Sequence, residues 1–326
     1  MRPFEYSRAA DLAAATRMVA EGARPIAGGT NLLDLMKLEI ERPERLVDIS
    51  RLPLAGFEAE GEGLRIGAVV TNSACAADPR IRRDYPVLAR ALLGGATFQL
   101  RNKATTAGNL CQRTRCYYFY NPDQPCNKRE PGTGCGAIGG FNRIHAILGA
   151  NELCIATYPG DMAVALCALD ATVEIAGPQG TTRTVPVRQF HRLPGEAPEK
   201  DNVLEPGEVI TAVILPPPAG GTQLYRKVRD RASYAFALVS IAAVVRLEQG
   251  RIAAASLAFG GLAHKPWHDP RIDQALTGQV PSDDLFAHVA DLLLENARVW
   301  GENDFKVPLT RRTLLAVLRQ ATGDQA

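Results

Sequence analysis

The feature that most constrains this chain is a cysteine-rich stretch with almost no regular periodicity. Five of the seven cysteines, Cys111, Cys116, Cys126, Cys135 and Cys154, fall within the 44 residues from 111 to 154, among many glycines, prolines, asparagines and tyrosines. An irregular segment of this size inside a compact domain is usually either functional or disordered. Because clustered thiols favour a function, we interpret residues 112–158 as a functional insertion.

The spacing of these cysteines favours an iron–sulfur cluster. None of them forms a CxxC pair, so a zinc ribbon or knuckle fits poorly. Four thiolates on a glycine-rich loop suit a cubane, whose irons prefer sulfur and whose sulfurs accept hydrogen bonds from irregular backbone. Cys111 is a fifth thiol and could serve in place of Cys116. We interpret Cys75 and Cys167, which lie outside the stretch, as ordinary buried thiols.

The bulk composition excludes several classes. Apolar residues make up 46% of the 326 residues and charged residues 22%, as in globular proteins. A net charge of +2 without a dense basic tract argues against nucleic-acid binding. No apolar run is long enough for a membrane helix. We expect no signal peptide at the start, so export would depend on a partner. The odd number of cysteines argues against a disulfide scaffold.

Periodicity predicts an α+β chain. Early strands at 24–27, 46–49 and 64–70 alternate with helices at 8–21, 32–40 and 87–93, whereas 98–110 reads as a loop. A helix from Asp161 leads into a strand. The proline- and glycine-rich LPPPAGG marks a boundary, and we expect domains at 1–217 and 222–326. Three strands, at 223–228, 237–247 and 252–259, and two helices, at 282–299 and 310–320, should complete the second domain.

Two loops have the composition of phosphate-binding loops. In the first, Gly28, Gly29, Thr30 and Asn31 follow a strand and precede a helix, so backbone N–H groups can approach an anion closely. The pattern is not GxGxxG. The second loop, ATTAGNL, repeats the same residue types, and the pair could hold the two phosphates of one dinucleotide.

A basic segment, YRKVRDRASYAF, has two interpretations. Lys227 and Arg231 could face an anionic flavin ring or a phosphate, with Tyr234 packed on a ring, but chemistry alone favours a solvated strand end. His145 stands alone, and a lone histidine is usually structural. No arrangement of side chains suggests hydrolysis.

Together these segments resemble the FAD-binding subunit of the xanthine dehydrogenase (molybdenum hydroxylase) superfamily, in particular the FAD and 4Fe-4S subunit of bacterial periplasmic aldehyde oxidoreductase. The resemblance rests on IAGGTNLLDLMKLEIERP, RNKATTAGNLCQRTRCYYFYN, CNKREPGTGCGAIGGFNRIHAILG and CIATYPGDMAVA, and it continues through AHKPW and FKVPLTRRTL. It implies a FAD-binding domain of the vanillyl-alcohol-oxidase type (PCMH-like) followed by a smaller α+β domain like that of CO dehydrogenase flavoproteins.

The resemblance also implies residue roles. The FAD pyrophosphate would be wrapped by Ile26, Ala27, Gly28, Gly29, Thr30, Asn31, Leu32, Leu33, Asp34, Thr106, Gly108 and Asn109. Asp161 would meet the ribose region and Lys227 would lie near the isoalloxazine. The 4Fe-4S ligands would be Cys116, Cys126, Cys135 and Cys154. No residue is expected to be catalytic in this chain.

By the same resemblance the chain is one subunit of a heterotrimer. A large molybdenum-cofactor subunit would oxidise the aldehyde, and a small 2Fe-2S subunit would pass electrons to FAD and an external acceptor. The location would be periplasmic, with cytoplasmic as the alternative. Two other functions stay open: a stand-alone FAD-dependent oxidase of the same fold, and a zinc-stabilised interaction subunit.

Overall fold

A small parallel sheet begins the chain, and a computed structural model describes residues 1–323. Its strands lie in the order β1 (Glu5–Arg8), β3 (Arg45–Asp48) and β2 (Arg24–Ile26). Helix α1 (Leu12–Ala20) is capped by Asp11, which accepts from the backbone N–H of Ala14 at 2.7 Å. The helix predicted from residue 8 therefore begins later, because residues 5–8 pair with β3.

A second sheet of five antiparallel strands follows. In spatial order they are β4 (Phe57–Glu60), β5 (Gly63–Gly67), β8 (Val209–Leu215), β6 (Thr172–Ala176) and β7 (Thr182–Pro186). The central strand β8 lies after the cysteine-rich segment in sequence, yet it pairs with both β5 and β6. The segment therefore leaves the domain and returns to it.

Short helices lie between the strands within these two sheets. They are α2 (Leu32–Lys37), α3 (Asn72–Ala77), α4 (Pro79–Asp84), α5 (Pro86–Gly94), α6 (Phe98–Arg101), α7 (Thr106–Leu110), α9 (Asp161–Ala168), the 3₁₀ turn η1 (Pro178–Gly180) and α10 (Val187–Phe190). The prediction of a loop at 98–110 was wrong. Side chains of Thr97 and Thr105 cap α6 and α7 by accepting from the backbone N–H groups of Leu100 and Gly108.

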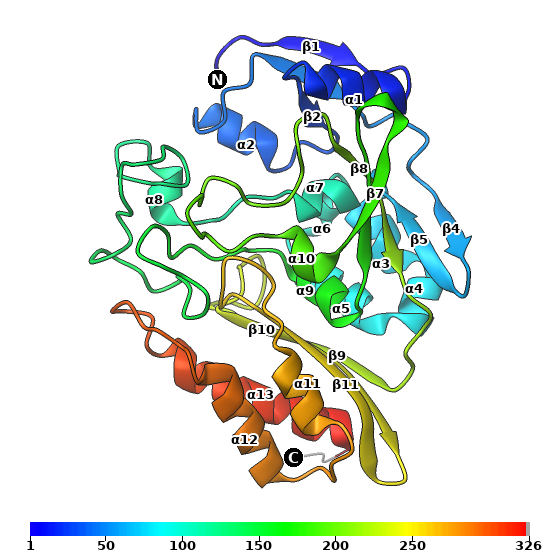
Figure 1. The fold of residues 1–326 in the computed structure, drawn as a ribbon, viewed down its shortest axis with the longest axis vertical. Coiled ribbons are helices and arrows are strands. Elements are labelled where there is room, and N and C mark those ends of the chain that lie inside the picture. Colours follow the sequence, from blue (N-terminus) through cyan, green and yellow to red (C-terminus); the bar gives the residue numbers. More distant parts are fainter. Residues whose placement is uncertain (324–326) are drawn as a thin grey trace.

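The cysteine-rich segment is irregular, as predicted. Its only regular element within the described chain is the single turn α8 (Tyr117–Tyr120). In Figure 1 this segment projects to one side, between the N-terminal sheet and the C-terminal helices.

The C-terminal part is an antiparallel sheet of β9 (Thr222–Val228), β10 (Val239–Glu248) and β11 (Arg251–Gly260). Helices α11 (Pro270–Leu276), α12 (Asp283–Leu294) and α13 (Lys306–Thr322) cover one face (Figure 1), and α5 and α9 pack on the other. All eight residues of α9 are buried. Mixed helix and sheet confirm the predicted α+β class, although several elements were not predicted, among them β1, β4, β7, α3, α4 and α11.

Candidate functional site: a nucleotide cavity beside a thiol set

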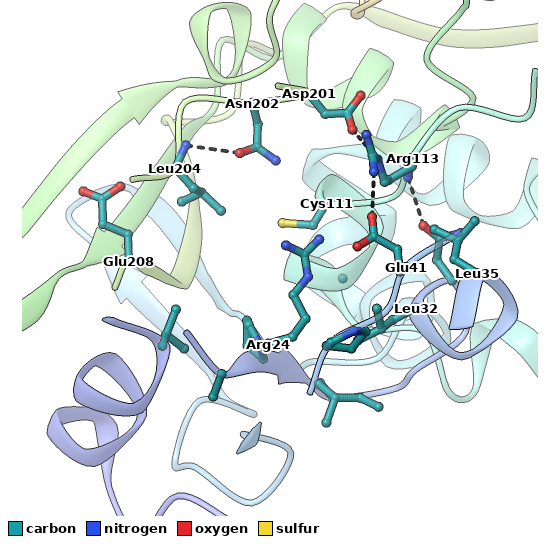
Figure 2. A pocket seen from close by; sticks show the side chains of 18 of the residues that line it. Arg24, Leu32, Leu35, Glu41, Cys111, Arg113, Asp201, Asn202, Leu204 and Glu208 are labelled. Atoms are coloured by element: carbon teal, nitrogen blue, oxygen red, sulfur yellow. Dashed lines mark hydrogen bonds and ion pairs between the residues drawn. The ribbon is translucent and has the colours of Figure 1, made fainter. Parts of the chain in front are cut away.

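A cavity of about 990 Å³ opens beside the first glycine loop (Figure 2). One wall is the chain from 22 to 32, which includes β2 and the loop after it, and the opposite wall is the segment 199–206. Thr105, Gly108 and Cys111 add to the lining from the second loop and the end of α7. The two loops that the sequence indicated therefore meet at one cavity.

Gly28 is required by the contact between these loops. A Cβ at this position would lie 2.0 Å from the backbone oxygen of Lys103, well inside van der Waals contact. Gly29 next to it has φ of +70°, which only glycine adopts at low cost. The loop can therefore lie directly against the second one and keep its backbone open toward the cavity.

Asn31 supplies a polar group that fits a ligand. Its Oδ1 accepts from the backbone N–H of Arg113 at 2.9 Å, while its buried Nδ2 has no hydrogen-bond partner among residues 1–323. A buried donor without an acceptor is costly, and Asn31 lines the cavity. A phosphate oxygen of a dinucleotide would satisfy it.

Charged residues that sequence reasoning missed also line the cavity. Figure 2 shows Arg24 pointing from β2 into it. On another wall, Arg113 donates through Nε to Asp201 at 2.7 Å and through Nη1 to Glu41 at 2.6 Å. No local motif marks these residues, because three separate segments meet here.

The predicted FAD residues divide into two groups. Eight line the cavity: Ile26, Ala27, Gly28, Gly29, Thr30, Asn31, Leu32 and Gly108. Four are not part of its lining: Leu33, Asp34, Thr106 and Asn109. Thr106 is buried and donates to the backbone oxygen of Val70, and Asn109 accepts from the side chain of Gln112. Roles of these four in binding stay predictions.

Asp161 and Lys227 form a separate buried pair. Lys227 donates to Asp161 at 2.8 Å and to the backbone oxygen of Gly94 at 3.1 Å, and Tyr225 donates to Asp161 at 2.5 Å. Burial, and then Asp161, raise the pKa of Tyr225, so its hydroxyl remains a donor. The interpretation of Lys227 as solvated was wrong, since its side chain is only 6% exposed. Arg231 and Tyr234 are exposed.

Three of the four predicted cluster cysteines pack in one small core. Cys116, Cys126 and Cys154 are buried together with Leu35 and Phe119. Cys135 joins them as the β-bridge partner of Cys126. Burial is the main cause that raises the pKa of Cys116 and Cys154 to about 12, and the nearby Cys126 contributes to this rise in both. Folding therefore gathers these four thiols, which we call the thiol set.

Asn127 organises the loop between Cys126 and Cys135. Its buried side chain accepts from the backbone N–H groups of Gly132 and Gly134, at 3.1 and 2.8 Å, and donates to the backbone oxygen of Leu153. Gly134 has φ of +96°, so a side chain there would strain the loop. The glycines and Asn127 thus shape the backbone around the thiols.

The other cysteines lie elsewhere. Cys111 lines the cavity, which favours Cys116 as the member of the thiol set. Cys75 and Cys167 are buried in the main core, as predicted. No group of three or more His, Cys, Asp or Glu side chains in residues 1–323 is arranged to hold a metal ion. A cubane makes a different demand from a single ion, because each of its four irons takes its own cysteine.

Two buried histidines contact the thiol set. Nε2 of His145 lies 3.1 Å from Sγ of Cys116, and Nε2 of His264 lies 3.3 Å from Sγ of Cys154. Burial, and then Lys306, lower the pKa of His145 to about 4; burial, and then Lys128, lower that of His264 to about 3. Both rings are therefore neutral near pH 7.

The cavity and the thiol set share a wall. Leu35 lines the cavity and also packs in the core of the thiol set. Arg113, which lines the cavity, stacks over the ring of Phe119 with 4.7 Å from its guanidinium carbon to the ring centroid. A nucleotide cofactor in the cavity and a cluster on the thiols would thus be neighbours.

Comparison with known proteins defines the class. Residues 2–218 match the FAD binding domain in molybdopterin dehydrogenase, and residues 223–321 match the CO dehydrogenase flavoprotein C-terminal domain. The chain belongs to the family of FAD-binding subunits of the xanthine dehydrogenase and CO dehydrogenase enzymes. It is an oxidoreductase subunit that binds FAD, as predicted.

Three individual proteins show how similar the chain is to known members of this family and to their fold. The chain is 53% identical to the aldehyde oxidoreductase FAD-binding subunit PaoB of Escherichia coli (strain K12), over 98% of this chain and 99% of that one. It is 26% identical to the carbon monoxide dehydrogenase medium chain of Afipia carboxidovorans, over 98% and 95%. The fold resembles quinoline 2-oxidoreductase from Pseudomonas putida 86, with a TM-score of 0.75, 26% identity and coverage of 100% and 99%. The first two of these relatives are named as one subunit or one chain of an enzyme. No helix in residues 1–323 could span a membrane.

Proposed function

We propose that this chain is the electron-transfer subunit of a heterotrimeric, molybdenum-dependent aldehyde oxidoreductase, and that it holds a 4Fe-4S cluster as well as FAD. In this role it takes electrons from 2Fe-2S clusters of a small partner and passes them to an external acceptor, while a large molybdenum subunit oxidises the aldehyde. The observation that carries the proposal is the thiol set, buried directly behind the wall of the nucleotide cavity. The 53% identity to an aldehyde oxidoreductase subunit supports the substrate class.

The chain's own residues bind and separate the two groups. Gly28, Gly29 and Asn31 fit the FAD phosphates by close backbone approach and a free amide donor. Cys116, Cys126, Cys135 and Cys154 would hold the irons. Leu35 contacts both sites, because it lines the cavity and packs in the core of the thiol set. A flavin exchanges electrons singly or in pairs, which suits a link between one-electron clusters and a two-electron acceptor.

Metal and flavin analysis tests this proposal. The complex, expressed with its partner subunits and purified without oxygen, should lose about four irons per molecule when Cys126→Ala or Cys135→Ala is introduced. The flavin content should stay the same, and Cys75→Ala in the main core is the matched control that should keep all iron. Equal iron content in the three variants and the parent would refute the cluster.

The stand-alone oxidase alternative makes a different prediction. Steady oxidation of an aldehyde or alcohol by this chain alone would favour it over an electron-transfer subunit. We also propose a periplasmic location, which rests on the resemblance alone and requires export with a partner that carries a signal. Fractionation of cells that express all three subunits tests this, and recovery in the cytoplasmic fraction would contradict it.

A further inference from the structure

Two imidazoles approach the thiol set from different parts of the chain. His145 lies within the cysteine-rich segment, whereas His264 follows β11 in the C-terminal part. Each directs Nε2 at a different cysteine sulfur, at 3.1 Å from Cys116 and 3.3 Å from Cys154. Both residues are buried, with exposed fractions of 1% and 6%. These are hydrogen-bond distances for sulfur, which is larger than oxygen.

The backbone around the two histidines is fixed as one unit. The backbone oxygen of Leu262 accepts from the N–H groups of both Ile147 and Leu148, at 2.9 and 3.0 Å. Buried Lys306 at the start of α13 donates to the backbone oxygens of His145 and Gly261, at 2.9 and 2.7 Å. The segments that carry the two rings are therefore joined directly and through a third element.

The direction of the hydrogen bonds follows from the ligand chemistry. A cysteine bound to iron is a thiolate, which has lone pairs and no proton, so it can only accept. The ring nitrogen that faces it must then carry the proton.

We propose that His145 and His264 are positioning residues that donate N–H to the sulfurs of Cys116 and Cys154 and raise the midpoint potential of the cluster. The inference rests on the proposed function. Reduction adds one electron, whose charge spreads onto the sulfurs, and a donor at the sulfur stabilises this more negative state. The other two cysteines of the set receive no such bond from a histidine within residues 1–323.

Paired substitutions test the role. His145→Phe and His264→Phe keep a flat ring but remove the donor, whereas His145→Gln and His264→Gln place an amide N–H where Nε2 stood. In a redox titration of the complex followed by EPR, the cluster is identified as the signal that Cys126→Ala abolishes. Each phenylalanine variant should shift its midpoint potential downward, and each glutamine variant should return it toward the parent value. His288→Leu on the exposed face of α12 is the control and should leave it unchanged.

The outcomes separate this inference from the function on which it rests. A parent complex without the Cys126-dependent irons would refute the proposed function. If the parent holds the cluster and all four histidine variants have the same midpoint potential as the parent, the inference is overturned while the proposed function stands. If the phenylalanine variants lose iron, labelling with ¹⁵N-histidine decides, because pulsed EPR of the parent cluster should detect coupling to histidine nitrogen. No coupling would overturn the inference.

Discussion

At the scale of single residues, the shape of the cavity depends more on how closely two backbone segments approach each other than on side-chain chemistry. The sequence indicated Gly28 as a residue that leaves room for a phosphate. In the structure, Gly28 also allows the first loop to contact the second loop. The backbone oxygen of Lys103 occupies the space where its Cβ would be. The glycine loop and the second loop can therefore meet only if residue 28 has no side chain.

Gly28→Ala should consequently weaken both the fold and flavin binding. Forcing the two loops apart is overpacking, which costs about 1–3 kcal/mol, and it displaces the residues that face the cavity. We expect a lower free energy of unfolding in guanidinium and less FAD per chain. Gly56→Ala is the control, because a Cβ there meets only the end of Glu58 at 3.9 Å. Equal flavin content in the two variants would contradict the assignment of Gly28.

Residue types that are specific to one chemistry were predictable, and residues that depend on folding were not. The clustered cysteines and the glycine pair after a strand marked themselves in the sequence, and the structure brings the cysteines together and places the glycines at the cavity. Asp201 looks like any surface acid in the sequence, and only folding brings it to Arg113. His145 was interpreted as structural because its partner Cys116, 29 residues away, could not be inferred. His264 lies 110 residues from Cys154 and carried no signal at all.

At the scale of elements, a buried ion-pair network ties the cysteine-rich segment to the cavity wall. Lys128, which lies between Cys126 and Cys135, donates to Asp201 at 2.5 Å and is almost fully buried. Asp201 also accepts from Arg113. Burial opposes ionisation of Asp201, but Lys128 and Arg113 outweigh it and lower its pKa to about 2.

This network predicts a pH-dependent stability. The pKa of Asp201 is lower in the folded chain than its unfolded value near 4, so its contribution is present above about pH 4 and is lost as pH falls toward 2. The shift corresponds to about 2 kcal/mol. Guanidinium unfolding between pH 5 and pH 2.5 should show a shallower loss in Asp201→Asn than in the parent.

The control for this experiment is Asp123→Asn, an exposed carboxylate in the same segment, which should keep the parent's pH profile. Asp201→Asn should also be less stable than the parent at pH 7, because it leaves the buried ammonium of Lys128 without its charged partner. A pH profile that is identical in the parent and in Asp201→Asn would contradict the network.

Helices and strands were predictable where a hydrophobic pattern runs through many consecutive residues. The helix at Asp161 and the strands of the C-terminal sheet lie close to their predicted bounds. Helices α6 and α7 were missed because four or five residues show no period, and their threonine caps work only in that tertiary setting. Strand β1 was missed because its partner β3 lies about 40 residues away.

At the scale of the whole molecule, α9 joins the two parts into one core. It packs against α5 on one side and against β10 and β11 on the other. Ala242, Val244 and Ala258 of the C-terminal sheet belong to the same hydrophobic core as the N-terminal strands. The opposite face of that sheet supplies the core beneath α11–α13.

The chain should therefore unfold in a single transition. Both tryptophans, Trp267 and Trp300, lie in the C-terminal part, so their fluorescence reports on that part and on its contacts with Asn142 and Gly149. Far-UV circular dichroism reports on the whole chain. We expect the two signals to change at the same guanidinium concentration, and two separated midpoints would show that the parts unfold independently.

The bonds that join Lys306, His264 and the cysteine-rich segment limit how this segment can be moved into another protein. An engineer who moved only residues 112–158 into a flavoprotein lacking them would carry over four sulfurs but leave behind the ammonium and the imidazole that come from the far end of the chain. Such a chimaera would need matching changes after β11 and at the start of α13 before its loop could take the same shape.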